Sequence, residues 1–412
     1  MKKIFFIFGV FVFQSCWAMD SNSNRLSEGS QLLAQDSFFA QIEDNFTNQE
    51  CYEDKDLIFY FFNTGQGNCT LVKQGNKALL IDCGGSNTIA FDKTFTKCLG
   101  DALIECVIIT HPHDDHYEFL KKIHQKHFSE NIFLLIGGPI KWKGHKLINV
   151  VDDFGVSFKE RYYTSNYCLA NNIENPSESL VKDQNHMLIL EEKLKNLFEG
   201  VEFNFLRFGG KLLDENNLNS YSLVFKITYK NNSILFTGDS TGDAFDRFLT
   251  QSGTNPFQDS IVGENREIIK NVNVFVMPHH GTDTDGSWRW TNRIIKDNYL
   301  NLVAMIACVD PGTSPYGHAR NWIRDLIFPL YACMNDKGHT IVYSVKTGKG
   351  EGLKAYSKYI KETKNRLYET GLFTYGIVLV FSESGKIHIL NSPNDTNLTH
   401  LPKNGEEKDD MG

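Results

Sequence analysis

The sequence lacks an excess of basic residues. Its 412 residues include 42 Lys and Arg against 50 Asp and Glu, which gives a formal net charge of −8. A mildly acidic protein has no overall electric field that attracts nucleic acid, and this argues against, without excluding, an enzyme of DNA or RNA.

The nine cysteines include no CxxC pair, which argues against a structural zinc cluster. Internal repeats and low-complexity segments are also missing, and the hydrophobic content of 41% is that of an ordinary globular protein.

Long apolar runs are absent after the N-terminal region. Residues 4–13 are apolar, follow Lys2 and Lys3, and precede Ala18. A basic start, a short apolar run and a small residue at the cleavage position predict a secretory signal peptide of bacterial type. The apolar run is too short to cross a membrane comfortably. We therefore expect cleavage after Ala18 and a secreted or periplasmic protein with no transmembrane segment in its mature form; lipid attachment at Cys16 is the alternative.

The remaining cysteines allow two interpretations. Nine cysteines minus Cys16 leave eight after the predicted cleavage position. An even number of cysteines in an exported protein permits disulfides, although the sequence does not indicate their pairing. The favoured interpretation for Cys69, Cys83 and Cys106 is that they are small, buried apolar groups in strands.

Apolar segments of four to nine residues predict the domain organisation. In chain order, we expect a signal peptide at 1–18, an N-terminal extension at 19–56, a main domain at 57–392 with an insertion at 138–215, and a polar tail at 393–412. Helical spacing is seen at 117–123 and 191–198. The expected strands of the main domain lie at 57–62, 70–72, 77–82, 106–109, 221–229, 233–239, 272–278, 302–309, 376–381 and 386–390.

A cluster of imidazoles and carboxylates follows the expected strand at 106–109. Residues 110–116 read THPHDDH. Because alternate residues of an extended chain point the same way, His111 and His113 can share one side, and Asp115 and His116 can face the same volume from the start of the next helix. Imidazole and carboxylate together suit a divalent metal such as zinc. A solvated polar loop is the alternative, but it does not account for this spacing.

The spacing His-x-His-x-Asp-His resembles the metal-binding signature of the metallo-β-lactamase superfamily. This resemblance implies an α/β fold, namely an αββα sandwich of two mixed sheets flanked by helices. It also implies that His111 and His113 bind a first metal ion and that Asp115 and His116 bind a second. Asp114 fills a variable position and receives no role.

Further segments resemble the hydrolase domain of the bacterial competence-channel proteins. TGQGN at 64–68, LLIDCGG at 79–85 and LFTGD at 235–239 match its motifs. By this resemblance Asp239 bridges two metals, while Asp82 orients the metal-binding loop instead of binding metal. A helix cap is the alternative role for Asp239.

Two histidine segments complete the resemblance. HHGT at 279–282 implies that one of its histidines binds the second metal. We favour His279, and His280 is the alternative ligand or a substrate contact. YGHAR at 316–320 implies that His318 is a substrate-facing acid with Arg320 near it. Buried histidines without a metal, or a loop histidine without a role, are the alternatives.

The sequence departs from the superfamily pattern before the hairpin at 221–239. Many superfamily members have a histidine there that completes the first metal site, whereas residues 216–222 contain none. Water or Asn219 then has to complete that site. We therefore expect one or two zinc ions, with manganese as an alternative.

The combined pattern predicts a metal-dependent hydrolase with Asp115 and His318 as its catalytic candidates. Phosphodiester hydrolysis is the leading reaction, on a nucleic acid or a phosphorylated component of the cell envelope. A β-lactamase or other acyl-hydrolase is an alternative, made weaker by the missing histidine. A protein that binds a ligand or partner without turnover is the second alternative.

Overall fold

The computed structural model divides the chain into residues 1–45 and residues 46–412, and all described residues lie in the second unit. The expected signal peptide and polar tail lie outside the described residues, as do His318 and Arg320. Among the residues that are described, no helix is long and apolar enough to cross a membrane. The described residues are 52–86, 88–138, 147, 149, 162–164, 192–207, 217–242, 269–282, 286–298, 301–308, 367–369 and 376–390.

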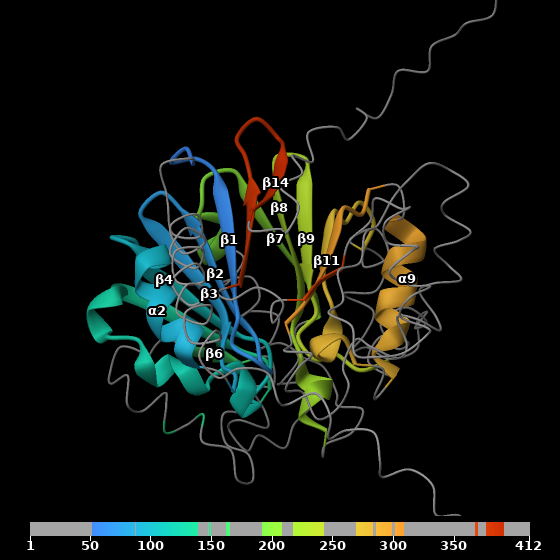
Figure 1. Cartoon of the computed structure of the whole chain (residues 1–412), viewed down its shortest axis with the longest axis horizontal. Coiled ribbons are helices and arrows are strands. Elements are labelled where there is room, and N and C mark those ends of the chain that lie inside the picture. Colours follow the sequence, from blue (N-terminus) through green and yellow to red (C-terminus); the bar gives the residue numbers. More distant parts are fainter. Residues whose placement is uncertain are drawn as a thin grey trace, which may run out of the picture. The chain divides into compact units, whose positions relative to one another are not determined.

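The first sheet has eight strands in the order β14-β13-β1-β2-β3-β4-β5-β6 (Figure 1). Its antiparallel half runs from β14 to β3, and its parallel half from β3 to β6. The sheet is therefore mixed. The strands are β1 (Leu57–Phe62), β2 (Cys69–Gln74), β3 (Lys77–Cys83), β4 (Leu103–Ile109), β5 (Phe128–Ile136), β6 (Tyr162–Thr164), β13 (Gly376–Phe381) and β14 (Ile387–Leu390).

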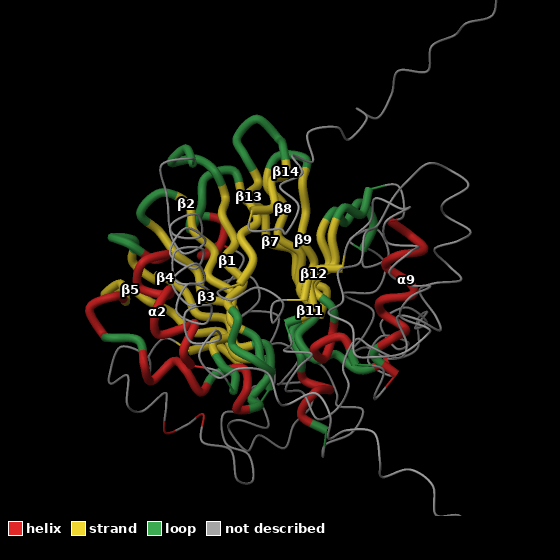
Figure 2. Tube along the Cα trace, viewed as in Figure 1, coloured by secondary structure: helices red, strands yellow, loops and turns green. Residues whose placement is uncertain are grey.

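The second sheet has six strands in the order β12-β11-β10-β9-β8-β7. Strands β9 to β12 are parallel, whereas β7, β8 and β9 are antiparallel, so this sheet is mixed as well. Figure 2 shows the strands of both sheets in yellow, with helices outside them. The strands are β7 (Val201–Arg207), β8 (Val224–Tyr229), β9 (Asn232–Phe236), β10 (Val274–Val276), β11 (Ala304–Ala307) and β12 (Leu367–Glu369).

The two sheets pack through aromatic side chains that alternate along their strands. Phe59 and Phe61 of β1 lie 6.4 and 6.3 Å, between ring centroids, from Phe236 of β9. Phe236 in turn stacks on Phe225 of β8 at 5.2 Å. Because side chains of a strand alternate between faces, Phe62 points the other way. Replacing one of these buried rings by alanine should cost about 3–5 kcal/mol.

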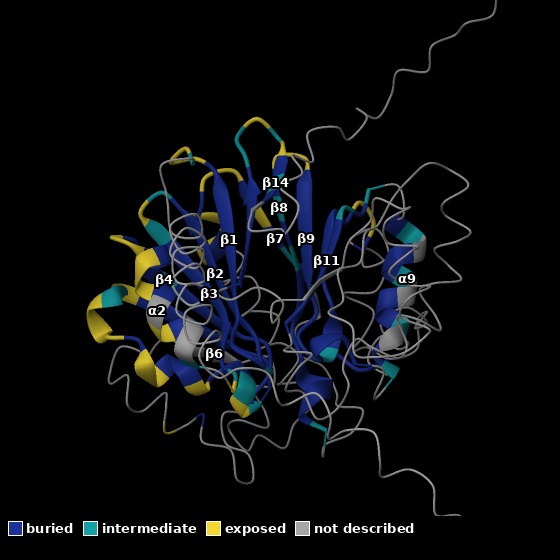
Figure 3. Cartoon of the chain, in the orientation of Figure 1, coloured by how far each residue is buried: buried dark blue, intermediate teal, exposed yellow. Residues whose placement is uncertain are grey.

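Helices cover the outer faces. Helix α2 (Thr88–Leu99) places Phe91 and Phe95 5.9 and 5.5 Å from Phe62 on the outer face of the first sheet. Helix α9 (Trp288–Asn298) is attached to the segment before β10, because the side chain of Asn298 donates to the carbonyl of Ile269 and accepts from the N–H of Val272. Figure 3 shows the buried strands in dark blue and the exposed residues on α2 and the outer loops.

The predicted sandwich of two mixed sheets flanked by helices is confirmed. Some local expectations differ. The stretch 117–123 forms a short 3-10 helix, η3 (Glu118–Lys122), and the strand expected from residue 221 begins at Val224 because η5 (Leu218–Tyr221) precedes it. Strands β6 and β7 fall inside the range expected as an insertion, yet they extend the two sheets.

Strand β7 could have been recognised from the sequence. Its residues read VEFNFLR, in which apolar and polar positions alternate as far as Phe205. Val201, Phe203 and Phe205 all enter the core between the sheets. This is the pattern of a strand with one buried face.

Candidate metal centre

The polar residues of the predicted site follow the carboxyl ends of β3, β4, β9 and β10. Neighbouring strands β3 and β4 are parallel, as are β9 and β10, so in each sheet the carboxyl ends of the two strands meet at one edge. The two sheets are joined there, because the N–H of Leu223 donates to the carbonyl of Thr110 at 2.9 Å. Two short helices complete the edge, η2 (Asp114–His116) after β4 and η6 (Pro278–Gly281) after β10.

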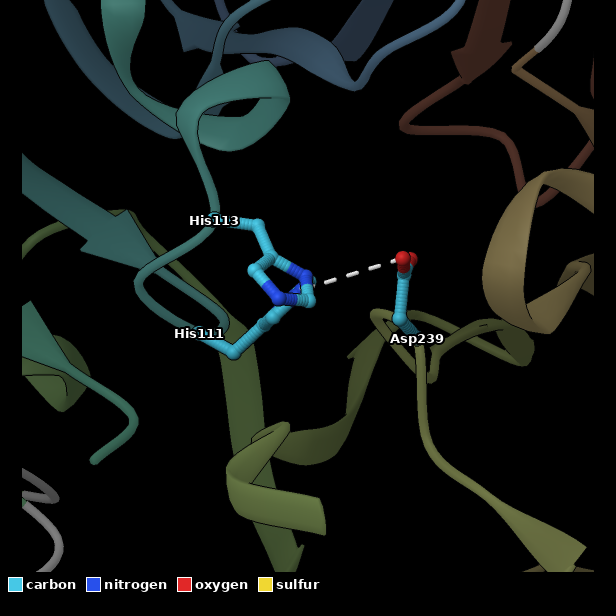
Figure 4. Close-up of side chains that lie close together, drawn as sticks. All are labelled: His111, His113 and Asp239. Atoms are coloured by element: carbon cyan, nitrogen blue, oxygen red, sulfur yellow. Dashed lines mark hydrogen bonds and ion pairs between the residues drawn. The ribbon is translucent and has the colours of Figure 1, made fainter. Parts of the chain in front are cut away.

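The first group of donor atoms comes from His111, His113 and Asp239 (Figure 4). Their potential ligand atoms all lie within 4.8 Å of one another. Nε2 of His111 is 2.8 Å from Nδ1 of His113 and 3.7 Å from Oδ2 of Asp239. His111 and Asp239 are buried, whereas His113 is partly exposed. Two imidazole nitrogens and one carboxylate oxygen thus converge on a single volume.

The second group comes from Asp115, His116 and His280, whose potential ligand atoms also lie within 4.8 Å of one another. Nε2 of His280 is 3.2 Å from Oδ2 of Asp115. The side chain of Asp115 is 29% exposed, whereas both imidazoles are buried. The group is therefore open to solvent on the side of Asp115.

Asp239 lies between the two groups. Its Oδ1 is 3.2 Å from Nε2 of His116, and its Oδ2 is 3.5 Å from Nε2 of His280 and 3.7 Å from Nε2 of His111. Oδ1 thus faces His116, and Oδ2 faces both His280 and His111, so the carboxylate is near buried imidazoles of both groups. This is the position that the sequence predicts for a bridging aspartate.

The surroundings of two buried atoms in this centre argue that it holds a metal ion. Nε2 of His116 and Oδ1 of Asp239 form an ion pair at 3.2 Å, but neither makes a hydrogen bond of good geometry within the described part of the chain, although both are shielded from water. Buried polar atoms normally have partners, because an unsatisfied one costs about 1–3 kcal/mol. A cation between imidazole nitrogen and carboxylate oxygen would satisfy both, and this donor set is one that zinc accepts.

Asp239 and the imidazoles around it shift one another's pKa values. Burial raises the pKa of Asp239, but His116 and His280 outweigh burial and hold that pKa well below its ordinary value. Burial likewise opposes a charge on His116, whereas Asp239 and Asp82 raise its pKa well above the ordinary value. The negative charge of Asp239 is thus balanced by protons on imidazoles, and metal ions could take the place of those protons.

His111 differs from the other buried imidazoles. Burial, followed by the effect of His116, lowers the pKa of His111 well below its ordinary value. Its ring is therefore neutral at neutral pH. A neutral imidazole has a lone pair available for a metal, so His111 needs no deprotonation before it can bind one.

Asp82 orients the metal-binding loop through three hydrogen bonds. Its Oδ1 accepts from the N–H of Thr110 at 2.7 Å, and its Oδ2 accepts from Oγ1 of Thr110 at 2.9 Å. The same Oδ2 lies 2.8 Å from Nδ1 of His116. Because Nδ1 is engaged by this carboxylate, Nε2 is the nitrogen that faces the space where a metal ion would bind. Asp82 thus occupies the supporting position that the resemblance implies.

Glycines bring neighbouring backbone up to this loop. A Cβ on Gly84 would lie 2.3 Å from the carbonyl carbon of Asp115 and 2.5 Å from the nitrogen of His116. A Cβ on Gly67 would lie 2.7 Å from the carbonyl oxygen of Asp115. Only residues without a side chain allow this approach. Gly67 of TGQGN and Gly84 of LLIDCGG are therefore explained by close packing against the metal-binding loop.

Asp239 is positioned by its own neighbours. Gly238 has φ 49°, which turns the chain sharply after β9. The N–H of Asp239 then donates to Oγ of Ser222 at 3.0 Å, and Oγ1 of Thr237 donates to the carbonyl of Val276 at 2.8 Å. Ser222 and Thr237 were not predicted as site residues. Thr237 lies within the LFTGD motif and Ser222 lies just before β8, and hydroxyl residues at these strand ends are the sequence signal that could have indicated them.

The two histidines of η6 take different places. Nδ1 of His280 contacts the carbonyl of Cys308 at 3.0 Å, which leaves Nε2 toward Asp115 and Asp239. His279 is 20% exposed, and its Nε2 is 3.9 Å from Oδ2 of Asp239. The structure thus groups His280 with the second donor set, whereas the sequence favoured His279.

The backbone explains this difference. The sequence argument placed the ligand at the residue nearer the strand end. However, His279 and His280 both have positive φ, 51° and 56°, which non-glycine residues rarely adopt. Two successive left-handed residues reverse the chain and direct the second imidazole into the centre.

Asn219 lies in η5, near the hairpin that ends at Asp239. The residue is buried, and its Oδ1 makes no hydrogen bond with any described residue. No third histidine joins His111 and His113 in the described part of the chain. His318 and Arg320 lie outside the described residues, so their roles stay predictions.

Comparison with known families indicates one group of proteins. The sequence model of the Metallo-beta-lactamase superfamily matches residues 62–128, which include the loop from His111 to His116. Over this segment the chain is similar to that superfamily, and the two donor groups are candidate metal sites. No curated protein matches the sequence.

Solved structures similar to this chain share little sequence with it. The metallo-beta-lactamase fold protein YhfI from Bacillus subtilis is 14% identical, and the match covers 79% of this chain and all of that chain (100%), with a TM-score of 0.36. CmlA, a diiron β-hydroxylase from Streptomyces venezuelae, is 16% identical over 70% of this chain and 52% of that chain, with a TM-score of 0.36. The short form of human tRNase Z is 14% identical, and the match covers 54% of this chain and 77% of that chain, with a TM-score of 0.27. These likenesses do not indicate a substrate.

Proposed function

We propose that this protein is a secreted or periplasmic, metal-dependent hydrolase of phosphodiester bonds in a nucleic acid or a phosphorylated envelope component. The observation that supports it most strongly is the position of Asp239 between two groups of imidazole and carboxylate donors. Two nearby dications repel each other and need a shared anionic ligand. A buried carboxylate that faces both groups meets this need.

The donor atoms indicate which residues would hold each ion. His111, His113 and Asp239 would hold the first, with Asn219 or water completing its ligands. Asp115, His116 and His280 would hold the second, again with Asp239. Zinc suits these ligands, and manganese is the alternative. When bound, such ions acidify a water molecule and polarise the scissile group.

The chain's own residues define where a substrate would approach. His113, Asp115 and His279 are the partly exposed members of the centre, while the imidazoles of His111, His116 and His280 are buried beneath them. A phosphodiester would therefore reach the centre from the side of these three residues. His318, the expected substrate-facing acid, is assigned to this side by the resemblance alone.

The phosphodiester assignment rests on the motifs of the competence-channel type and on the first donor group. That group contains two histidines and no third in the described residues. Acyl-hydrolases of the superfamily usually have the third histidine, which makes the lactam reaction the weaker alternative.

A substrate panel with matched variants tests the proposal. Zinc- or manganese-loaded protein is assayed on bis(p-nitrophenyl) phosphate, on single- and double-stranded DNA, and on a chromogenic cephalosporin. We expect metal-dependent phosphodiester cleavage that Asp115→Ala and His111→Ala abolish and His124→Ala, in an exposed turn, retains. Cleavage of the lactam alone contradicts the phosphodiester assignment. Full metal content without turnover on any substrate contradicts an enzyme and favours a binding protein.

A further inference from the structure

Two cysteines face each other directly across the strands that lead into the metal centre. Cys69 opens β2 and Cys83 closes β3, and the antiparallel register makes them partners. Both thiols are buried, with exposed fractions of 1% and 0%. The two side chains therefore project to the same side of the sheet, as opposite residues of neighbouring strands do.

The hydrogen-bond pattern shows whether Cys69 and Cys83 form a hydrogen-bonded or a non-hydrogen-bonded pair of the antiparallel ladder. The N–H of Gly84 donates to the carbonyl of Asn68 at 3.0 Å, so the residues just outside the two cysteines are joined by a ladder hydrogen bond. In an antiparallel ladder the next pair inward is then a non-hydrogen-bonded pair. Such pairs have their side chains closest together, with Cα atoms about 4.5 Å apart. Disulfides need Cα atoms about 4.4–6.8 Å apart, so this pair fits.

Both residues are free thiols in this structure. Burial, followed by a hydrogen bond with Cys83, raises the pKa of the Cys69 thiol well above its ordinary value. A buried thiol with a raised pKa reacts slowly in the folded protein. Oxidation is therefore expected while the chain folds, before the pair is enclosed.

We propose that Cys69 and Cys83 form a cross-strand disulfide when the chain folds in the presence of a small-molecule disulfide such as oxidised glutathione. One cysteine thiolate attacks the glutathione disulfide, forms a mixed disulfide and releases one reduced glutathione. The second thiolate then attacks the cysteine sulfur of that mixed disulfide and releases the other. Two protein thiols lose two electrons and two protons, and one oxidised glutathione becomes two reduced ones.

The link would join two segments that support the metal-binding loop. Cys83 follows Asp82, the extra residue of the bulge in β3, with φ 51°. Cys69 follows Asn68, whose N–H donates to the carbonyl of Asp115 at 3.1 Å. A disulfide here would hold Asp82 and Asn68 in place even without metal. The inference is independent of the proposed hydrolase activity, because its tests measure mass and melting temperature.

Other pairings are less favoured by the geometry. Cys308 is near enough to contribute to the raised pKa of Cys69. However, it lies after β11 in the second sheet, and no strand ladder sets it opposite either thiol. Cys106 lies within β4, where it pairs with Phe133 and not with a cysteine. Cys106 is therefore a matched control, as a buried thiol of the same sheet.

Peptide mapping tests the pairing. The full chain is refolded with reduced and oxidised glutathione and a chelator, alkylated, and digested with trypsin without reduction. We expect a linked species of peptides 56–73 and 78–93, which contain Cys69 and Cys83 and no other cysteine, lighter by two hydrogens than the two thiol peptides. Alkylation of both peptides, or a link from either to another cysteine, overturns the proposal.

Thermal melting provides a second, independent test. Reduction should lower the melting temperature of the wild-type protein by about 5 °C, since a short-loop disulfide restricts the unfolded chain. Cys106→Ser should keep this drop, whereas Cys69→Ser with Cys83→Ser should show none. If the serine pair does not fold, Cys69→Ala with Cys83→Ala replaces it. A drop of equal size in the double variant, or none in the wild type, refutes the disulfide.

Discussion

Oδ2 of Asp82 lies 2.8 Å from Nδ1 of His116, although 34 residues separate them in the chain. The contact joins the end of β3 to the loop after β4. It fixes the imidazole so that Nε2 faces Asp239, 3.2 Å away. The orientation of this predicted ligand therefore depends on a carboxylate that we do not assign to the metal.

Asp82→Asn should weaken metal binding without changing the fold. The amide fills the same space and tolerates the positive φ, but it cannot accept from both Thr110 and His116 as the carboxylate does. Loss of such a supporting partner typically costs about 10–100-fold in metal affinity. Zinc competition with a chromophoric chelator measures this, with Asp101→Asn, at an exposed position, as the control. Equal affinity in the wild type and in Asp82→Asn would show that the contact has no supporting role.

His280→Ala and His279→Ala should have different effects on metal content. His280 is buried with Nε2 toward Asp115, whereas His279 is partly exposed. We expect His280→Ala to lose one ion and His279→Ala to retain all of the wild-type content. Metal analysis by mass spectrometry after gel filtration gives the count. Loss of an ion in His279→Ala with full content in His280→Ala would instead identify His279 as the ligand.

Gly84→Ala should damage the metal centre. Its Cβ would lie 2.3 Å from the carbonyl carbon of Asp115, which is backbone and cannot move aside cheaply. We expect a loss of about 3 kcal/mol in the free energy of unfolding, together with reduced metal content. Gly385→Ala is the control, because a Cβ there meets nothing within 4 Å and only the positive φ of 78° opposes it; this should cost about 1 kcal/mol. Denaturant unfolding compares the two variants, and equal losses would contradict the close packing.

Metal affinity should rise with pH between about 6 and 8. Burial lowers the pKa of His116 and of His280, but the neighbouring carboxylates together outweigh it and raise both, Asp239 with Asp82 for His116 and Asp239 with Asp115 for His280. The metal-free imidazoles therefore hold protons that binding has to displace, and affinity should increase up to about tenfold per pH unit for each proton released. Chelator competition at pH 6 and 8, corrected for the chelator's own protonation, measures this. An affinity that does not change with pH would mean that the ligands are already deprotonated.

The metal-free protein should show the opposite trend in stability. Because the folded-state pKa of His116 is raised, its contribution to stability is complete below about pH 6.5 and is lost as pH rises through the folded-state pKa. We expect a higher melting temperature at pH 6 than at pH 9 when chelator is present. A melting temperature that increases toward pH 9 would show that this imidazole does not contribute.

The sequence by itself predicted much of the fold. Strands such as β1, β3 and β13 follow from apolar segments bounded by glycine and polar residues, whereas the sandwich was implied by the resemblance of the motifs to the metallo-β-lactamase superfamily. It also identified the loop from His111 to His116, because local spacing alone can bring those donors together. Asp239, far from that loop in the chain, was indicated by its position at the end of an expected strand and by the resemblance of LFTGD to a family motif. The signal peptide and the roles of His318 and Arg320 stay predictions.

Only the tertiary structure groups His280, and not His279, with Asp115 and His116, because a left-handed backbone at both residues determines which imidazole points inward. It alone placed Ser222 and Thr110 beside the predicted ligands. It also set Cys69 opposite Cys83, since a bulge of one residue shifts the register of β3. These features depend on contacts between segments far apart in the chain, and a linear pattern of apolar and polar residues does not contain that information.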